Sequence, residues 1–297
     1  MSNKFNWESY EVPHRWTEEE DELRVPSESF TIRHLKQGAT GARKTWPAAE
    51  VLLEYLVQRG GLRDVSDKIP SGDHETLNLT LPPARPSFEK VEEPYNIVEL
   101  GGGTGMLSAG LSLALNDVES TTRLICTDND KPTLKNMRHN ISRQPASTNM
   151  NKTVRIEALD WGHDVGGDKF SSALRSQFRN RSTETTRETC DHEQPQDPLR
   201  LLSHLIASDV LYGTTTVDPL SSVISAVKLR NPHVIVVLLL KERSPNSVAI
   251  LKQKIEAKVQ QGLDMTDQPC ESNLQGFQVS VRDVIHNDLE DMKMVEC

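Results

Sequence analysis

The chain has 297 residues, of which 36% are hydrophobic, with a mean hydropathy of −0.52 and a formal net charge of −9. This length fits one α/β domain with insertions, and no apolar run approaches the ~20 residues that cross a bilayer. The acidic balance argues against a nucleic-acid partner, which needs a basic surface, and is compatible with a basic protein substrate.

The cysteines and the first residues of the sequence indicate in which cellular compartment the protein is expected. Cys126, Cys190, Cys270 and Cys297 are scattered without a C-x-x-C pair, so they predict neither a zinc site nor a disulfide framework, and we expect no metal. The first residues lack the apolar core of a signal peptide. We therefore expect a soluble monomer of the cytoplasm or also of the nucleus, with no membrane partner.

The N-terminal third is expected to lie outside the main sheet. Residues 1–27 are polar and acidic and predict a flexible arm. Residues 28–59 predict a strand and a helix packed on the core, because alternating residues precede a helical apolar spacing that begins at Pro47. Residues 60–94 are rich in Gly, Pro, Ser and charge, which is typical of a linker or surface insertion.

Strands and helices alternate over residues 95–297, which we expect to form the main domain. The expected strands cover residues 96–100, 123–127, 154–158, 201–207, 234–240, 277–281 and 292–295, and the helices 104–116, 131–142, 218–230 and 247–261. Residues 163–198 are polar without periodicity and predict a disordered insertion. The pattern predicts an α/β, Rossmann-like, seven-stranded and mostly parallel sheet with helices on both faces, an antiparallel C-terminal strand and an N-terminal extension.

A glycine turn follows the first of these strands. Glu99 stands two positions before Gly101, and glycines then recur at Gly103 and Gly105. A dinucleotide fingerprint, G-x-G-x-x-G, would need a third glycine where Met106 stands. The E-x-G-x-G-x-G spacing instead resembles the first motif of the seven-strand S-adenosylmethionine (SAM) methyltransferases. The acidic residue suits the ammonium of the methionine moiety, and bare backbone suits close approach.

Polar and aromatic residues follow the later strands, where ligands of such sheets bind. Asp128 can accept hydrogen bonds from two ribose hydroxyls, whereas Asp130 is expected to cap the next helix. Trp161 can lie against a flat adenine and Asp160 can accept from its exocyclic amine. The backbone of Ser208 is expected to face the adenosine, and Asp209 and Tyr212 to line the mouth for the substrate.

These residues together resemble the family-16 seven-strand methyltransferases, which are mostly protein-lysine methyltransferases of non-histone substrates. The shared segments are Thr45-Trp46-Pro47-Ala48-Ala49, Glu99 to Gly105, Thr127-Asp128, Asp160-Trp161-Gly162 and the D-x-x-Y motif Asp209-Val210-Leu211-Tyr212. The resemblance implies cofactor contacts at Trp46, Gly101, Gly102, Gly103, Asp128, Trp161 and Ser208. It implies substrate-side, catalytic roles for Asp209 and Tyr212, and a protein substrate such as a translation factor, ribosomal protein or chaperone. Where Gly102 stands, the family commonly has cysteine, alanine or serine, and glycine should be tolerated.

Four other interpretations stay open at this stage. The glycine turn can be a tight strand-to-helix connection without a ligand. The acceptor can be a small-molecule amine, or an adenine or glutamine, although the latter enzymes usually show N-P-P-Y-like residues where Asp209 to Tyr212 stand. The chain can be an inactive SAM-binding module, although the D-x-x-Y motif is intact. An NAD-dependent oxidoreductase is disfavoured by Met106.

Overall fold

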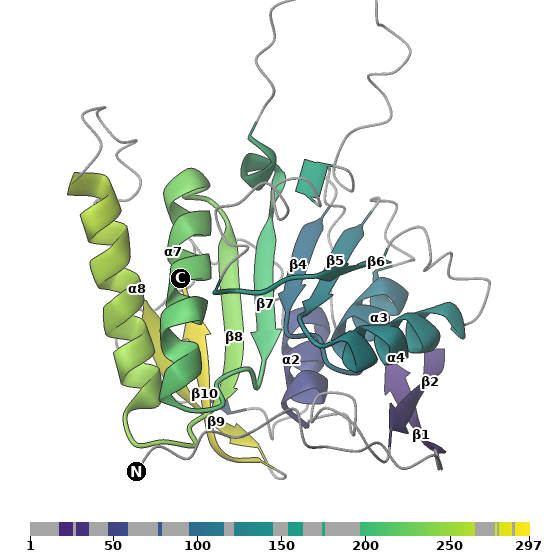
Figure 1. The fold of residues 1–297 in the computed structure, drawn as a ribbon. Coiled ribbons are helices and arrows are strands. Elements are labelled where there is room, and N and C mark those ends of the chain that lie inside the picture. The colour runs from purple at the N-terminus through teal and green to yellow at the C-terminus, as the bar shows by residue number, and fades with distance from the viewer. Residues whose placement is uncertain are drawn as a thin grey trace, which may run out of the picture.

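A computed structural model describes residues 18–25, 28–35, 47–58, 77–78, 95–115, 122–144, 154–162, 174–175, 197–264, 277, 279–286 and 289–297. An eight-stranded sheet, shown in Figure 1, has the strand order β3-β9-β10-β8-β7-β4-β5-β6. Its strands are β3 (Leu77–Asn78), β4 (Asn96–Leu100), β5 (Arg123–Asp128), β6 (Val154–Ala158), β7 (His204–Ser208), β8 (Ile235–Lys241), β9 (Ser280–His286) and β10 (Leu289–Glu296).

The sheet is parallel except at β10. Strands β6, β5, β4, β7 and β8 pair in parallel, and β10 runs antiparallel to both β8 and β9. Seven of the strands are those expected from the sequence, and the two-residue β3 extends the edge by pairing with β9. The predicted α/β architecture with an antiparallel C-terminal strand is confirmed.

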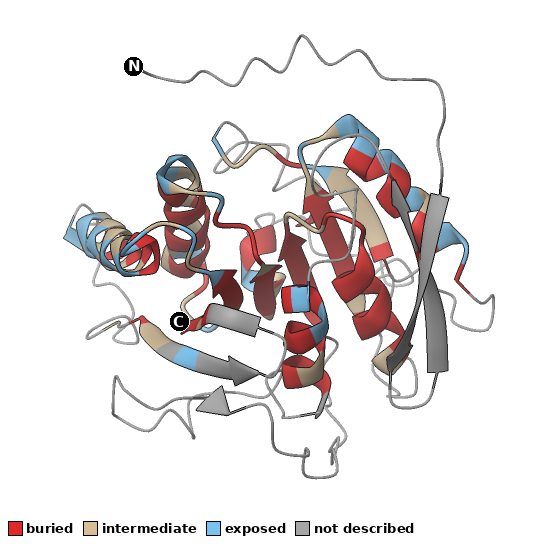
Figure 2. Cartoon of the chain, turned by 90° about the horizontal axis from the view of Figure 1, so that it is seen from below, coloured by how far each residue is buried: buried red, intermediate tan, exposed pale blue. Residues whose placement is uncertain are grey.

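Helices cover both faces of the sheet. One apolar cluster joins α2 (Pro47–Gln58), α3 (Met106–Ala114) and α4 (Lys131–Ser142) to one face, and the other joins α7 (Val217–Arg230) and α8 (Ser247–Asp264) to the opposite face. Neighbouring strand residues alternate between the clusters, as Ile97 and Val98 do. Burial on both faces explains the unbroken apolar run of β8, and Figure 2 shows the central strands of the sheet as buried.

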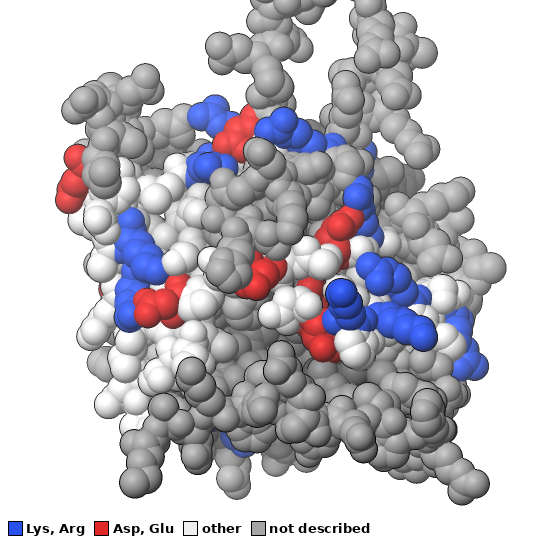
Figure 3. All heavy atoms as spheres, viewed as in Figure 1, with Lys and Arg blue, Asp and Glu red and all other residues white. Residues whose placement is uncertain are grey.

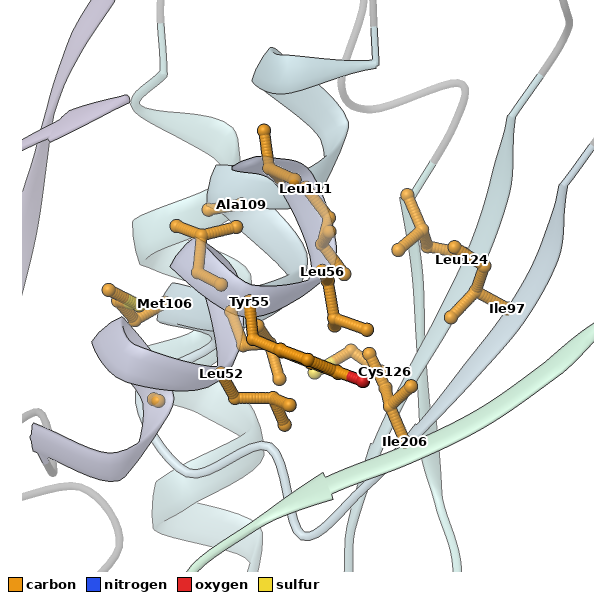
Figure 4. Packing of buried hydrophobic residues seen from close by; sticks show 14 of the residues in the cluster. Leu52, Tyr55, Leu56, Ile97, Met106, Ala109, Leu111, Leu124, Cys126 and Ile206 are labelled. Atoms are coloured by element: carbon orange, nitrogen blue, oxygen red, sulfur yellow. The ribbon is translucent and has the colours of Figure 1, made fainter. Parts of the chain in front are cut away.

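Helix α2 packs on the sheet and is hydrogen-bonded to β10. Leu52, Tyr55 and Leu56 point from α2 into the cluster (Figure 4). The Tyr55 hydroxyl donates to Glu296 of β10 at 2.6 Å, and both residues are buried. This hydrogen bond joins segments that are 241 positions apart in the sequence.

Three expectations about local structure need correction. Residues 18–25, assigned to the flexible arm, form β1 (Glu18–Val25), which pairs with β2 (Glu28–Leu35), because backbone hydrogen bonds require no apolar pattern. Leu174, inside the insertion predicted to be disordered, is fully buried in the second cluster. The strand expected over residues 201–207 is preceded by a 3-10 turn, η5 (Pro198–Leu201), which Asp197 caps by accepting from the N–H of Leu199 at 3.1 Å.

Other boundaries differ by a few residues. Helix α3 begins at Met106 rather than at residue 104, because Gly105 still has a positive φ. Strand β9 covers residues 280–286 rather than 277–281, and β10 covers residues 289–296 rather than 292–295. None of the described helices has both the length and the apolar character needed to cross a bilayer. On the face shown in Figure 3, basic and acidic side chains are interspersed.

Candidate functional site

The glycine turn joins β4 to α3. Gly101, Gly103 and Gly105 have φ angles of 65°, 56° and 80°, in the left-handed region that glycine adopts without a Cβ penalty. The N–H of Gly102 donates to the Thr127 carbonyl at 2.8 Å, which ties the turn to the end of β5. The turn therefore presents bare backbone at the carboxyl edge of the sheet.

Two side chains contact the turn at Gly101. A Cβ at this position would lie 2.7 Å from Cγ1 of Val210 and 3.4 Å from Cζ2 of Trp161. Val210 follows β7 and Trp161 follows β6. The segments after three different strands therefore meet at Gly101, and this places the predicted cofactor residues beside the D-x-x-Y motif.

Glu99 lies beneath the turn and is 1% exposed. Its Oε2 accepts from the hydroxyl of Ser108 on α3 and from Sγ of Cys126 on β5 at 3.0 Å. Burial raises the pKa of Glu99 to about 7, although these two hydrogen bonds act in the opposite direction. Glu99 thus connects strand, turn and helix, and its predicted contact with the cofactor ammonium stays a prediction.

Gly102 has no room for a side chain. A Cβ here would lie 2.2 Å from Sγ of Cys126 and 3.3 Å from Cδ of Glu99. The Cys126 sulfur therefore fills the space that a side chain at position 102 would take. This explains in physical terms why glycine is tolerated at a position where the resembling family commonly has a side chain.

Asp128 bridges the end of β5 and the glycine turn. Its Oδ2 accepts from the N–H of Gly103 at 3.2 Å, and its Oδ1 accepts from the N–H groups of Asn129 and Asp130 at 2.8 and 3.1 Å. Burial raises the pKa of Asp128, and these backbone donors counteract that rise. The carboxylate is held at the strand end, where the ribose contact was predicted.

Asp130 caps α4, as predicted. Its side chain accepts from the N–H of Thr133 at 2.8 Å and from the Thr133 hydroxyl at 2.6 Å. Two carboxylates only two positions apart therefore have different surroundings. Asp130 satisfies a helix N-terminus, whereas Asp128 faces the glycine turn.

Trp161 and Asp160 follow β6. The Trp161 ring packs against the second apolar cluster and Gly101, and its buried Nε1 has no hydrogen-bond partner among the described residues. Asp160 accepts from the N–H of Gly162 at 2.8 Å. Ser208 ends β7 and is half-buried. Trp46 lies outside the described residues, so its predicted cofactor contact stays a prediction.

Asp209 follows β7 and is only 3% exposed. Both of its carboxylate oxygens accept from the guanidinium of Arg243, at 2.5 Å each. Its backbone N–H donates to the Leu239 carbonyl at 2.7 Å, and its φ of 52° is left-handed. Asp209 is therefore one member of a bidentate ion pair rather than an isolated carboxylate, and its predicted place at the substrate mouth stays a prediction.

Tyr212 stands beside this pair. Its residue is 50% exposed, and the Arg243 guanidinium carbon lies 5.1 Å from the centre of its ring. Desolvation of the hydroxyl, and next the negative charge of Asp209, raise the pKa of Tyr212 to about 12. The phenol is consequently neutral at physiological pH, and its predicted role on the substrate side stays a prediction.

The sequence reasoning missed three residues of this site. Arg243 was overlooked, although it follows β8 and the rule that ligands bind at strand ends applies there too. Ser108 and Cys126 face Glu99 from a helix and from a strand interior, where no local pattern marks them. Among the described residues, no three His, Cys, Asp or Glu side chains gather as metal ligands.

The arrangement fits a nucleoside cofactor that carries an amino acid moiety. Bare backbone at Gly101 to Gly103 allows close approach, and the Asp128 carboxylate can accept from ribose hydroxyls. The unpartnered Nε1–H of Trp161 is a buried donor, and such a group is usually satisfied in a complete site. These residues would hold the cofactor, with the Asp209–Arg243 pair close to the turn.

Comparison with known families identifies the domain. Residues 26–175 match the family described as lysine methyltransferase, methyltransferase family 16. The match includes β2, α2, the glycine turn and strands β4 to β6. The cofactor of this methyltransferase family is SAM, which the residues at the turn fit. No curated protein matches the chain.

Solved structures give more distant matches. The T. thermophilus 16S rRNA N2 G1207 methyltransferase RsmC, in complex with AdoMet and guanosine, has a TM-score of 0.46 and 12% identity over 94% of this chain and 50% of that chain. The human methyltransferase 10 domain containing protein has a TM-score of 0.41 and 10% identity, and the match covers 85% of this chain and 82% of that chain. The N-terminal domain of human METTL16 in complex with SAH has a TM-score of 0.40 and 11% identity, and the match covers 85% of this chain and 70% of that chain. The chain thus spans half the length of the first structure, and similarity at this level does not identify an acceptor.

Proposed function

Because this chain belongs to the lysine methyltransferase family, we propose that it methylates a lysine side chain of a non-histone protein, such as a translation factor, ribosomal protein or chaperone. The observation that supports this most is the position of the D-x-x-Y motif. Val210 packs against the glycine turn, so Asp209 and Tyr212 stand beside the residues that would hold the cofactor.

Each group has a distinct task in the proposed reaction. When bound, SAM supplies an activated methyl group. The chain aligns the acceptor with that group, and alignment is the main contribution to be expected of an enzyme in an in-line displacement. Asp209 accepts a hydrogen bond from the acceptor amine, and Tyr212 forms a wall of its channel. The acceptor amine must be neutral, because the protonated amine has no free electron pair.

The cofactor half of the proposal is tested with two neighbouring carboxylates. Asp128→Asn should weaken SAM binding at least about tenfold in calorimetry, because a carboxylate hydrogen bond contributes roughly 1.5–3 kcal/mol. The matched variant Asp130→Asn should leave SAM affinity unchanged and affect only stability, since its side chain caps α4. Equal loss of affinity in both variants would contradict the assignment of Asp128.

The acceptor half is tested by labelling. The enzyme is incubated with isotopically labelled SAM and a cell extract, and mass spectrometry locates the modified residue. We expect methylated lysine; label found only on arginine, histidine, nucleic acid or a small molecule would refute the proposal.

The role of Asp209 is tested in the same assay. Asp209→Ala and Asp209→Asn should retain SAM binding and lose transfer by at least about 100-fold, with circular dichroism confirming the fold. Asp283→Ala is the matched control, because Asp283 is also ion-paired, with Lys293, but lies on β9, which is separated from β7 by β10 and β8. Loss of SAM binding in both Asp209 variants would contradict the role given to this residue.

A further inference from the structure

The ion pair between Asp209 and Arg243 is built by two adjacent strands. Asp209 directly follows β7 and Arg243 follows β8, and these strands pair in parallel with Ser208 opposite Leu239. The two guanidinium nitrogens donate to the two carboxylate oxygens at 2.5 Å, in the fork geometry that fixes both groups. The relative position of the charges is therefore set by the sheet itself.

The same guanidinium contacts both residues assigned to the acceptor. It is bidentate to Asp209 and lies 5.1 Å from the centre of the Tyr212 ring. Asp209 also has a left-handed backbone, a conformation that is uncommon for residues with a side chain and that aspartate adopts more readily than most. Such positions are found often at functional sites, and the two hydrogen bonds to Arg243 fix the orientation of the carboxylate.

The charge of this pair decides which form of an amine is favoured beside it. An unpaired carboxylate would stabilise a lysine ammonium, whose reference pKa is ~10.4, and so would oppose the loss of its proton. A carboxylate paired with a guanidinium contributes almost no net charge. It still has free lone pairs, because two oxygens offer about four acceptor positions and Arg243 uses one on each.

Among the residues that the structure describes, the other titratable groups near this pair do not replace Arg243. The pKa of Tyr212 is raised to about 12, so this residue carries no charge, and the negative charge of Asp128 affects Tyr212 less than that of Asp209 does. Glu242 accepts from the N–H of Val248 at 3.4 Å and is thus turned toward α8. The hydrogen bonds with Asp209 raise the pKa of Arg243, which therefore stays protonated.

We propose that Arg243 is a positioning residue for methyl transfer, which cancels the charge of Asp209 so that Asp209 orients the acceptor amine without holding it in the unreactive ammonium form. The inference rests on the proposed function. The ammonium first releases its proton to water. The electron pair of the neutral amine then forms the N–C bond, the C–S bond breaks with its pair retained by sulfur, and a methylated ammonium results.

The test compares pH–rate profiles of the full chain, with labelled SAM at saturation and heat-treated cell extract as acceptor. In Arg243→Gln, the rate of methyl transfer at pH 7.5 should fall on the order of 10- to 100-fold. The rising limb of the pH–rate profile should move to higher pH by about 1–2 units. This is the effect expected of one unit charge at roughly 6–8 Å and an effective dielectric constant of ~20. Near pH 10 the rate should therefore approach that of the unaltered enzyme.

Two variants separate charge from structure. Arg243→Lys keeps the positive charge but loses the bidentate hydrogen bonding of the guanidinium. Its pH–rate profile should therefore rise at the same pH as that of the unaltered enzyme, with a lower maximal rate. Arg155→Gln removes a guanidinium paired with Glu157 on β6, away from the mouth, and should change neither rate nor profile. A loss in Arg243→Gln that is the same at every pH would overturn the inference, because a merely structural role predicts that result.

A second readout measures the amine without turnover. A synthetic peptide around the labelled lysine, carrying ¹³C at Cε, is titrated by NMR on the enzyme with S-adenosylhomocysteine bound. The pKa of the bound amine should be higher by about 1–2 in Arg243→Gln than in the unaltered enzyme, and equal values would overturn the inference. Failure of the proposed function shows separately: the unaltered enzyme would then label no lysine, and a non-ionising acceptor would refute both.

Discussion

The contact between Gly102 and Cys126 makes a quantitative prediction about packing under the glycine turn. Gly102 is not among the glycines with positive φ, so alanine at this position meets no backbone strain. Its Cβ would, however, lie 2.2 Å from Sγ of Cys126 and 3.2 Å from Cε of Met137. Ordinary contact begins near ~3.5 Å, so the sulfur would have to move by about 1.3 Å.

The free energy of unfolding that Gly102→Ala should lose follows from the burial of the Cys126 sulfur. Cys126 is fully buried and its Sγ is hydrogen-bonded to Glu99, so it cannot move freely. Overpacking of a filled core costs about 1–3 kcal/mol, and we expect this loss in Gly102→Ala. Cys126→Ala alone should cost about 1–2 kcal/mol, because it removes a buried sulfur and a donor to Glu99.

The double variant tests the steric argument. With Cys126→Ala present, the space beside position 102 is open, so adding Gly102→Ala should cost at least about 1 kcal/mol less than it does alone. Urea unfolding followed by circular dichroism, without cofactor, measures the four free energies of the cycle. If the stability loss of the double variant equals the sum of the two single losses to within about 0.3–0.5 kcal/mol, the steric argument is refuted, because the effects of independent sites add.

Two further predictions concern buried polar groups. The folded-state pKa of Glu99 is about 7, against ~4.3 in an unfolded chain, so the stability it contributes is full below about pH 4 and is lost as pH rises through 7. Relative to Glu99→Gln, the unaltered protein should lose about 2–3 kcal/mol of unfolding free energy between pH 5 and 8, and parallel curves would contradict this. Tyr55→Phe removes the donor to buried Glu296 and should cost about 1–3 kcal/mol in urea unfolding. An unchanged midpoint would show that the bond between α2 and β10 does not contribute.

Much of the fold follows from patterns that are local in the sequence. The strand before the glycine turn and helix α4 were expected over the residues where they occur, because apolar runs, a proline in the first turn and a capping aspartate are local signals. Strand β1 escaped prediction, since an acidic run such as Glu18 to Glu22 has no apolar alternation, whereas its partner β2 was expected from the alternating residues of this segment. The burial of Leu174 also escaped, because one leucine in a polar insertion has no periodic partner.

By itself, the sequence determined the order of the main strands and helices, the glycine spacing after β4, the carboxylate at the end of β5 and the carboxylate after β7. These features depend on residues close together in the chain. Only the tertiary structure decided that Asp209 faces Arg243 and that Cys126 fills the space beside Gly102. Parallel strands bring distant segments together at one edge, and which side chains meet there depends on strand order and register. The charge at the mouth, and with it the proposed control of the acceptor amine, is therefore a property of the folded sheet.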